Sequence, residues 1–109
     1  MSLPDPTLRE YLKPHPDVTV LEWDLTGEPP RPRLDIVVQP YMGSAEVLRG
    51  LEAVDTVLVQ STSIGYDGVA ESLPAGRVFA NAAGVHETST AELALALILA
   101  SQREFPRLL

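Results

Sequence analysis

Short apolar stretches alternate with stretches of helical pattern from residue 34 onward, and this alternation constrains the fold more than any other feature of the chain. Three of the apolar stretches predict strands at Leu34–Gln39, Asp55–Gln60 and Arg77–Ala80. The stretches between them predict helices at Ser44–Leu51 and Tyr66–Leu73. Strands that are joined by helical crossovers pair in parallel. We therefore expect an α/β protein with a flavodoxin-like parallel sheet flanked by helices.

The N-terminal third differs from this regular region because proline interrupts it repeatedly. Eight of the ten prolines lie at or before Pro40, and proline is disfavoured in helix interiors and central strands. Only short elements are expected here, a helix at Thr7–Lys13 and a strand at Val18–Trp23. In the regular region, Ser44 and Asp67 are expected to cap the helices that follow them. No repeat or linker marks a second domain, so residues 1–109 are expected to form one domain.

The stretch Leu93–Ala100 predicts a helix that is apolar in every direction. At about 100° per residue, Leu93 and Leu97 form one stripe. Leu95 and Leu99 form another stripe on nearly the opposite side. A surface helix normally has one apolar stripe and a polar back. We expect one stripe to pack on the chain's own core and the other to be covered by a partner that lies outside these 109 residues.

Sequence signals also predict where this helix begins and ends. Ser89 and Glu92 match a capping box, in which each side chain accepts a hydrogen bond from the backbone N–H of the other residue. The segment Gln102–Glu104 is polar, and Pro106 is expected to stop the helix. The apolar stretch is about half of the roughly 20 residues that span a bilayer, so a membrane-spanning helix is not expected.

Composition narrows the partners and the location of the protein. The formal net charge is −7 and the chain has a single lysine, so it lacks the clustered basic residues that nucleic acid or an anionic membrane requires. Cysteine is absent and His15 and His86 are the only histidines, so no metal site is expected. The first ten residues lack the basic and apolar regions of a secretory signal, and we expect a cytoplasmic protein.

Three segments follow the predicted strands, and ligands bind beyond the carboxyl ends of strands in open parallel sheets. These segments are Pro40–Gly43, Ser61–Asp67 and Asn81–Glu87. In Ser61–Asp67, a loop of small and polar residues precedes a helix start, where backbone N–H groups can converge on an anion. The alternative is a strand-to-helix turn in which Ser, Gly and Asp serve only the turn geometry.

Other polar or aromatic residues near these segments have structural explanations as well. His86 precedes the last helix and fits a solvated turn residue as well as a ligand contact. Asn81 is expected to hydrogen-bond within its own turn, while Tyr41 and Met42 suit a core or a pocket rim. The chain contains no G-x-G-x-x-G motif, P-loop or G-x-S-x-G motif, so these residues alone indicate no dinucleotide site.

Three segments taken in order resemble the N-terminal catalytic domain of the D-isomer-specific 2-hydroxyacid dehydrogenases. They are Val57–Asp67, Val78–Gly84 and Thr88–Arg103. That family has a strand leading into an S-x-G loop followed by Asp, a short strand ending in Asn and then Gly, and an Ala- and Leu-rich helix that begins with Ala-Glu. The resemblance covers about residues 34–105.

The resemblance implies a two-domain oxidoreductase that transfers a hydride between NAD or NADP and a 2-hydroxy or 2-keto acid. The backbone N–H groups of Ile64 and Gly65 would hold the carboxylate of the acid, and Ser63 would shape the loop. His86 falls where some members of the family place a polar contact to the substrate, and Tyr41 in the first loop is a further candidate contact. Thr90 falls where the hinge helix approaches the cofactor.

The family places its catalytic Arg, Glu and His and its glycine motif in a later Rossmann domain, and nothing in this chain corresponds to them. We therefore expect no bound cofactor and no catalysis from this chain alone. The acid that is recognised and the choice between NAD and NADP stay undetermined.

Two functions of other classes stay open. A non-enzymatic flavodoxin-like interaction module would form a homodimer through its last helix, because an apolar back suits a symmetric helix contact. A flavin-binding flavodoxin would use Ser61–Gly65 as a phosphate loop and Trp23 or a tyrosine to stack on the flavin ring.

Overall fold

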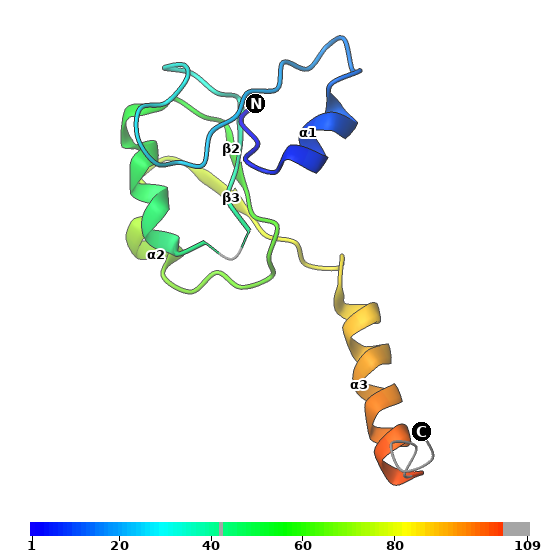
Figure 1. Ribbon diagram of the computed structural model, residues 1–109. Coiled ribbons are helices and arrows are strands. Elements are labelled where there is room, and N and C mark those ends of the chain that lie inside the picture. The colour runs from blue at the N-terminus through cyan, green and yellow to red at the C-terminus, as the bar shows by residue number, and fades with distance from the viewer. Residues whose placement is uncertain (42, 104–109) are drawn as a thin grey trace.

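The computed structural model describes residues 1–41 and 43–103, and this part of the chain is a mixed α/β structure built on a small parallel sheet (Figure 1). The strands are β1 (Ile36–Val38), β2 (Leu58–Gln60) and β3 (Val78–Ala80). They pair in parallel in the order β1-β2-β3, and the register aligns Val37 with Val59 and Val59 with Phe79. The three predicted strands are confirmed, each shorter than its apolar stretch.

The crossovers between these strands are also helical, as predicted. They are the 3-10 helix η1 (Ala45–Ala53) and the short α-helix α2 (Val69–Ser72). Leu48 and Leu51 of η1 are fully buried in one cluster with Val37 and Val59, so η1 covers that face of the sheet. Trp23, Leu25, Leu34, Val54 and Val69 complete the cluster.

One of the two predicted caps is confirmed and the other is wrong. The Ser44 hydroxyl accepts a hydrogen bond from the backbone N–H of Glu46 at the start of η1. Asp67 does not cap α2, whose N-cap is Gly68 with a left-handed φ of 76° and no side-chain hydrogen bond. Because the left-handed turn at Gly68 delays the helix, the carboxylate of Asp67 lies one residue too early to cap it.

The N-terminal third contains the helix α1 (Pro6–Leu12), close to the predicted range, with Asp5 accepting a hydrogen bond from the N–H of Leu8. The strand predicted at Val18–Trp23 is wrong. Only Leu21 forms an isolated parallel bridge, with Ser2, which bridges Val37 on its other side. Pro4 has no N–H to donate, so the ladder cannot extend beyond this short contact.

The helix α3 (Glu87–Gln102) extends away from the sheet (Figure 1), and it contacts no other described helix or strand. None of its described residues is buried, so the prediction that one apolar stripe packs on the chain's own core is wrong. Leu93, Leu95, Leu97 and Leu99 are each more than half exposed. The segment after β3 leads the chain away from the sheet before the helix begins, and this removes the chance of packing.

The start of α3 differs from the prediction as well. The helix begins at Glu87 with His86 as its N-cap, so Ser89 lies inside the first turn and the predicted capping box is wrong. The carboxylate of Glu87 instead accepts a hydrogen bond from the N–H of Gly84, which ties the preceding turn to the helix start. The helix ends at Gln102, and the predicted stop at Pro106 lies outside the described residues. Within those residues, no helix has the length and apolarity to cross a membrane.

Candidate functional site

The three segments that follow the strands meet at one edge of the sheet, as expected. Gln39, Ser61 and Asn81 are the first residues beyond β1, β2 and β3. The backbone N–H of Gln39 donates to the carbonyl of Gln60, and that of Ser61 donates to the carbonyl of Ala80. These bonds continue the ladder beyond the strands and hold the three loops at a fixed spacing.

The loop Ser61–Asp67, which follows β2, is held by hydrogen bonds within itself and from the segment that follows β3. The Ser61 hydroxyl accepts from the N–H of Ser63 at 3.0 Å. The side-chain amide of Asn81 donates to the carbonyl of Ile64 at 3.0 Å, while the N–H of Ala82 donates to the carbonyl of Ser63 at 3.0 Å. These three contacts use one N–H and two carbonyl groups of the loop.

The N–H groups of Ile64 and Gly65 donate to no other residue among those described. The N–H groups of Tyr66, Asp67 and Gly68 likewise donate to none of the described residues, so the loop contains a run of unpaired donors, and such donors suit an anionic oxygen as acceptor. The role of the Ile64 and Gly65 N–H groups as donors to an anion stays a prediction.

A cavity of about 290 Å³ lies beside this loop. Its lining consists of Gln39, Pro40, Gly43, Ala45, Ser61, Ser63, Gly65, Asp67 and Val69. Asp67 supplies a carboxylate, and among residues 1–41 and 43–103 no Lys, Arg or His lines this cavity. An anion bound here would rely on neutral backbone donors alone, which lowers the affinity compared with a site that contains a guanidinium group.

A second cavity of about 450 Å³ contains two more of the predicted residues, Tyr41 and His86, together with Thr62. Its other lining residues are Leu3, Pro4, Asp5, Thr7, Leu8, Val38 and Gln39. Gln39 lines both cavities, so they are neighbours. The structure thus brings Ser63, Gly65, Tyr41 and His86 to one region, divided between two cavities.

Two predicted residues take no part in either cavity. The Ile64 side chain is 41% exposed and lines neither, so its only proposed contribution is its backbone N–H. Thr90 lies on the exposed first turns of α3 and lines neither cavity.

Two further residues that line these cavities, Gln39 and Thr62, were not predicted from the sequence. Gln39 is 7% exposed, and its side-chain amide forms no hydrogen bond with another described residue. The Thr62 hydroxyl is buried without a hydrogen-bond partner in the described part of the chain. A signal for Gln39 was available, because a polar residue directly after a buried strand lies at the sheet edge where ligands bind.

The turn before α3 holds an ionised carboxylate by a backbone hydrogen bond. The N–H of Gly84 donates to the Glu87 carboxylate at 2.6 Å, and this hydrogen bond holds the pKa of Glu87 below the ordinary value for glutamate. A pKa that is depressed in the folded state gives stability that is present above the unfolded pKa and lost as the pH falls through the folded pKa.

We expect acidification to break this contact between the turn and the helix. In a pH titration followed by ¹⁵N NMR, the Gly84 amide should move with a midpoint below the ordinary glutamate pKa, because the folded turn prefers the ionised carboxylate. The Glu87→Gln variant keeps the side-chain length and should abolish the transition. A midpoint at or above the ordinary value would contradict the prediction.

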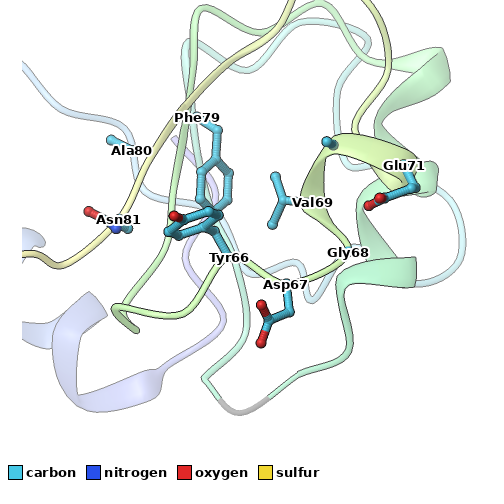
Figure 2. A pocket seen from close by; sticks show the side chains of 9 residues that line it. Tyr66, Asp67, Gly68, Val69, Glu71, Phe79, Ala80 and Asn81 are labelled. Atoms are coloured by element: carbon cyan, nitrogen blue, oxygen red, sulfur yellow. The ribbon is translucent and has the colours of Figure 1, made fainter.

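A cavity of about 690 Å³ is lined by the segment 66–71, which leads into α2, and by residues 79–81 at the end of β3 (Figure 2). The Tyr66 and Phe79 rings and Val69 form its apolar part, and the carboxylates of Asp67 and Glu71 lie at its other side. No basic residue of the described part of the chain lines this cavity, and none of the predicted substrate contacts belongs to it. Its size alone therefore indicates no ligand.

No glycines of the chain have the G-x-G-x-x-G spacing of a dinucleotide-binding loop. Within residues 1–41 and 43–103, no three histidine or acidic side chains gather in a way that could hold a metal ion.

The loop and the two cavities that share Gln39 are thus the candidate site, suited to a small ligand with an anionic end. Comparison with known proteins adds no identity to this geometry. The chain matches no protein-family model, no curated protein and no solved structure.

Proposed function

We propose that this chain is the substrate-binding domain of an NAD(P)-dependent dehydrogenase for a 2-hydroxy or 2-keto acid, and that it binds the carboxylate of that acid. The observation that carries the proposal is the run of unpaired N–H groups that begins with Ile64 and Gly65, in a loop fixed by Asn81 at the carboxyl ends of the strands. The order of the three resembling segments along the chain supports the same assignment.

A flavodoxin-like arrangement is part of the proposal. When the isolated bridges are included, the extended segments lie in the order Leu21, Ser2, β1, β2, β3. Numbered along the chain, this is the 2-1-3-4-5 order typical of flavodoxin-like sheets, in which ligands bind at the switch point between segments 1 and 3. The cavity that joins Leu3 and Pro4 to Val38 and Gln39 lies at that switch point.

The two neighbouring cavities would bind different parts of the substrate. The carboxylate would accept hydrogen bonds from Ile64 and Gly65, with Ser63 holding the loop. The remainder of the acid would extend past Gln39 toward Tyr41 and His86. In this proposal a separate Rossmann domain supplies the dinucleotide, approached by Thr90, and the groups that move the proton. The 109-residue chain itself is expected to be inactive, because one wall of a cleft cannot fix the reacting atoms.

The direct test is a titration of the ¹⁵N-labelled chain with pyruvate. We expect saturable shifts of the Ile64 and Gly65 amides with a Kd on the order of 1 mM, about −4 kcal/mol, since no cation assists the two donors. The Gly76 amide, in the turn before β3, should not move. Pyruvamide, which lacks the negative charge, should leave the loop amides unshifted.

Two substitutions at one position provide the matched control. Gly65→Pro removes the N–H donor, and pyruvate binding should be lost. Gly65→Ala keeps the donor, and the added Cβ meets no atom within 4 Å, so binding should be retained. Equal binding by the two variants, or equal shifts with pyruvate and pyruvamide, would refute the proposed carboxylate site.

A further inference from the structure

The cavity of about 450 Å³ is mostly apolar where it is buried and polar where it meets solvent. Leu3 and Val38 in its lining are 2% and 6% exposed. With the exception of Gln39 and the half-buried Thr62, the polar residues of the lining are exposed: Asp5, Thr7, Tyr41 and His86. A buried apolar wall stabilises an apolar group that leaves water, so this cavity suits a ligand whose inner part is hydrocarbon.

Among the described lining residues, Gln39 is the polar side chain that is most deeply buried, with 7% of it exposed. Its amide has no hydrogen-bond partner in residues 1–41 and 43–103, and an unpaired buried amide is unfavourable. A ligand that supplies the missing partner is therefore favoured. The amide contains both donors and an acceptor, so it can donate to a keto oxygen or accept from a hydroxyl group.

The exposed rim of the cavity disfavours a second acidic group on the ligand. Asp5 supplies a carboxylate there, and this carboxylate accepts a hydrogen bond from the N–H of Leu8 at 3.0 Å. Apart from His86, no basic residue of the described part of the chain lines the cavity. A second carboxylate on the ligand would meet the like charge of Asp5 without a Lys or Arg to offset it.

The volume of the cavity favours a side chain larger than the methyl group of pyruvate. Sites for small organic molecules have volumes of about 300–1,000 Å³. The cavity of about 450 Å³ falls within this range by itself, without the neighbouring cavity that contains Gly65. A methyl group would leave apolar surface at Leu3 and Val38 in contact with water.

We propose that the substrate is an acid with a large apolar side chain, such as isobutyl, which occupies this cavity, and that Gln39 binds the oxygen on the second carbon of the acid. The inference rests on the proposed carboxylate site at Ile64 and Gly65 and adds the class of substrate. Gln39 lines both cavities, so it lies where the carboxylate end of the acid would pass into the side chain. Its amide would donate to the oxygen of the keto acid and accept from the hydroxyl group of the hydroxy acid.

A titration of the ¹⁵N-labelled chain with three keto acids tests the side-chain preference. We expect 4-methyl-2-oxopentanoate to bind on the order of 10-fold tighter than pyruvate, because its additional carbons leave water. It should shift the amides of Leu3 and Leu8 as well as those of Ile64 and Gly65. The similarly sized 2-oxoglutarate should bind on the order of 10-fold more weakly than 4-methyl-2-oxopentanoate, because its second carboxylate would leave water without a partner.

Two variants of α1 provide a matched pair. Leu8→Ala removes an apolar side chain from the lining, and the preference for 4-methyl-2-oxopentanoate over pyruvate should fall to about threefold. Tyr11→Ala changes an exposed residue of the same helix that does not line this cavity, so the preference should stay on the order of 10-fold.

Gln39→Leu tests the contact to the oxygen on the second carbon. The unchanged chain should bind 4-methyl-2-oxopentanoate about fivefold tighter than 4-methylpentanoate, which has the same side chain and lacks that oxygen. Gln39→Leu keeps the backbone N–H that donates to the carbonyl of Gln60, and in this variant the difference between the two acids should disappear. A merely structural role of Gln39 would weaken the binding of both acids alike.

The outcomes separate the two proposals. Shifts at Ile64 and Gly65 without a preference for 4-methyl-2-oxopentanoate over pyruvate, or with 2-oxoglutarate bound as tightly, would overturn the apolar side chain and leave the proposed carboxylate site intact. A difference between the keto acid and 4-methylpentanoate that survives in Gln39→Leu would remove the role of Gln39. If no acid shifts the loop amides, the proposed function fails and this inference fails with it.

Discussion

Leu48→Ala is expected to lower the free energy of unfolding by about 2–5 kcal/mol. Leu48 is fully buried on η1, in the cluster that joins this helix to Val37 and Val59 of the sheet. Truncation removes the side chain at the point where the helix and the sheet meet, and the fixed strands behind it limit collapse of the resulting cavity. Urea unfolding followed by Trp23 fluorescence measures the loss, since this single tryptophan lies in the same cluster.

Arg49→Ala is the matched control, because the neighbouring side chain on the same helix is exposed. Its effect should stay within about 0.5 kcal/mol. If Leu48→Ala cost no more than Arg49→Ala, the packing of η1 on the sheet would be wrong.

The strands and crossovers could be predicted from sequence because their signals are local. The β-branched stretch that contains Ile36–Val38 ends at Pro40, which fixes one boundary without reference to the rest of the chain. Ser44 could be recognised as an N-cap for the same reason, since its partner Glu46 is two residues away. Alternation of such local elements is enough to predict a parallel α/β sheet.

The errors concern features that depend on distant residues or on competing local contacts. Val18–Trp23 has strand propensity, but a ladder needs a neighbour of equal length, and Ser2 offers one bridge. Ser89 fits a capping box, yet the helix begins earlier, at Glu87. The carboxylate of Glu87 accepts a hydrogen bond from the N–H of Gly84. The pattern of Leu93–Ala100 shows that this helix needs cover, but a pattern does not reveal which surface provides it.

The candidate site also contains residues with a local sequence signal and residues without one. Ser63 and Gly65 could be identified because a loop of small residues after a buried strand is visible in the sequence. Thr62 could not, because its interest comes from a buried hydroxyl without a hydrogen-bond partner among the described residues. Gln39 carried a local signal that was overlooked, since it directly follows a buried strand. The two cavities that share Gln39 are formed by segments from several parts of the chain, so their outline is a property of the fold alone.

Gly50→Ala is expected to destabilise the protein by about 1–3 kcal/mol, through overpacking rather than lost contact. A Cβ added at Gly50 would lie 2.5 Å from the carbonyl oxygen of Leu25. Displacing that carbonyl costs free energy, because Leu25 is only 3% exposed. Leu25 also has a φ of 67°, a left-handed conformation that costs a non-glycine residue roughly 1–2 kcal/mol. Hydrogen bonds from Trp23 to the carbonyl of Thr26, and from Thr26 to Asp24, hold the same turn.

Gly65→Ala is the matched control for this substitution, because its added Cβ meets no atom within 4 Å and its φ is not left-handed. Restricting the unfolded chain at such a position stabilises a protein by about 0.4–1 kcal/mol when the native backbone suits alanine. The two Gly→Ala changes should therefore shift the urea midpoint in opposite directions, with an unchanged denaturant slope. A Gly50→Ala midpoint at or above the wild-type value would mean that η1 does not pack closely on the turn at Leu25. The close approach of the Leu25 carbonyl would then no longer explain why position 50 is a glycine.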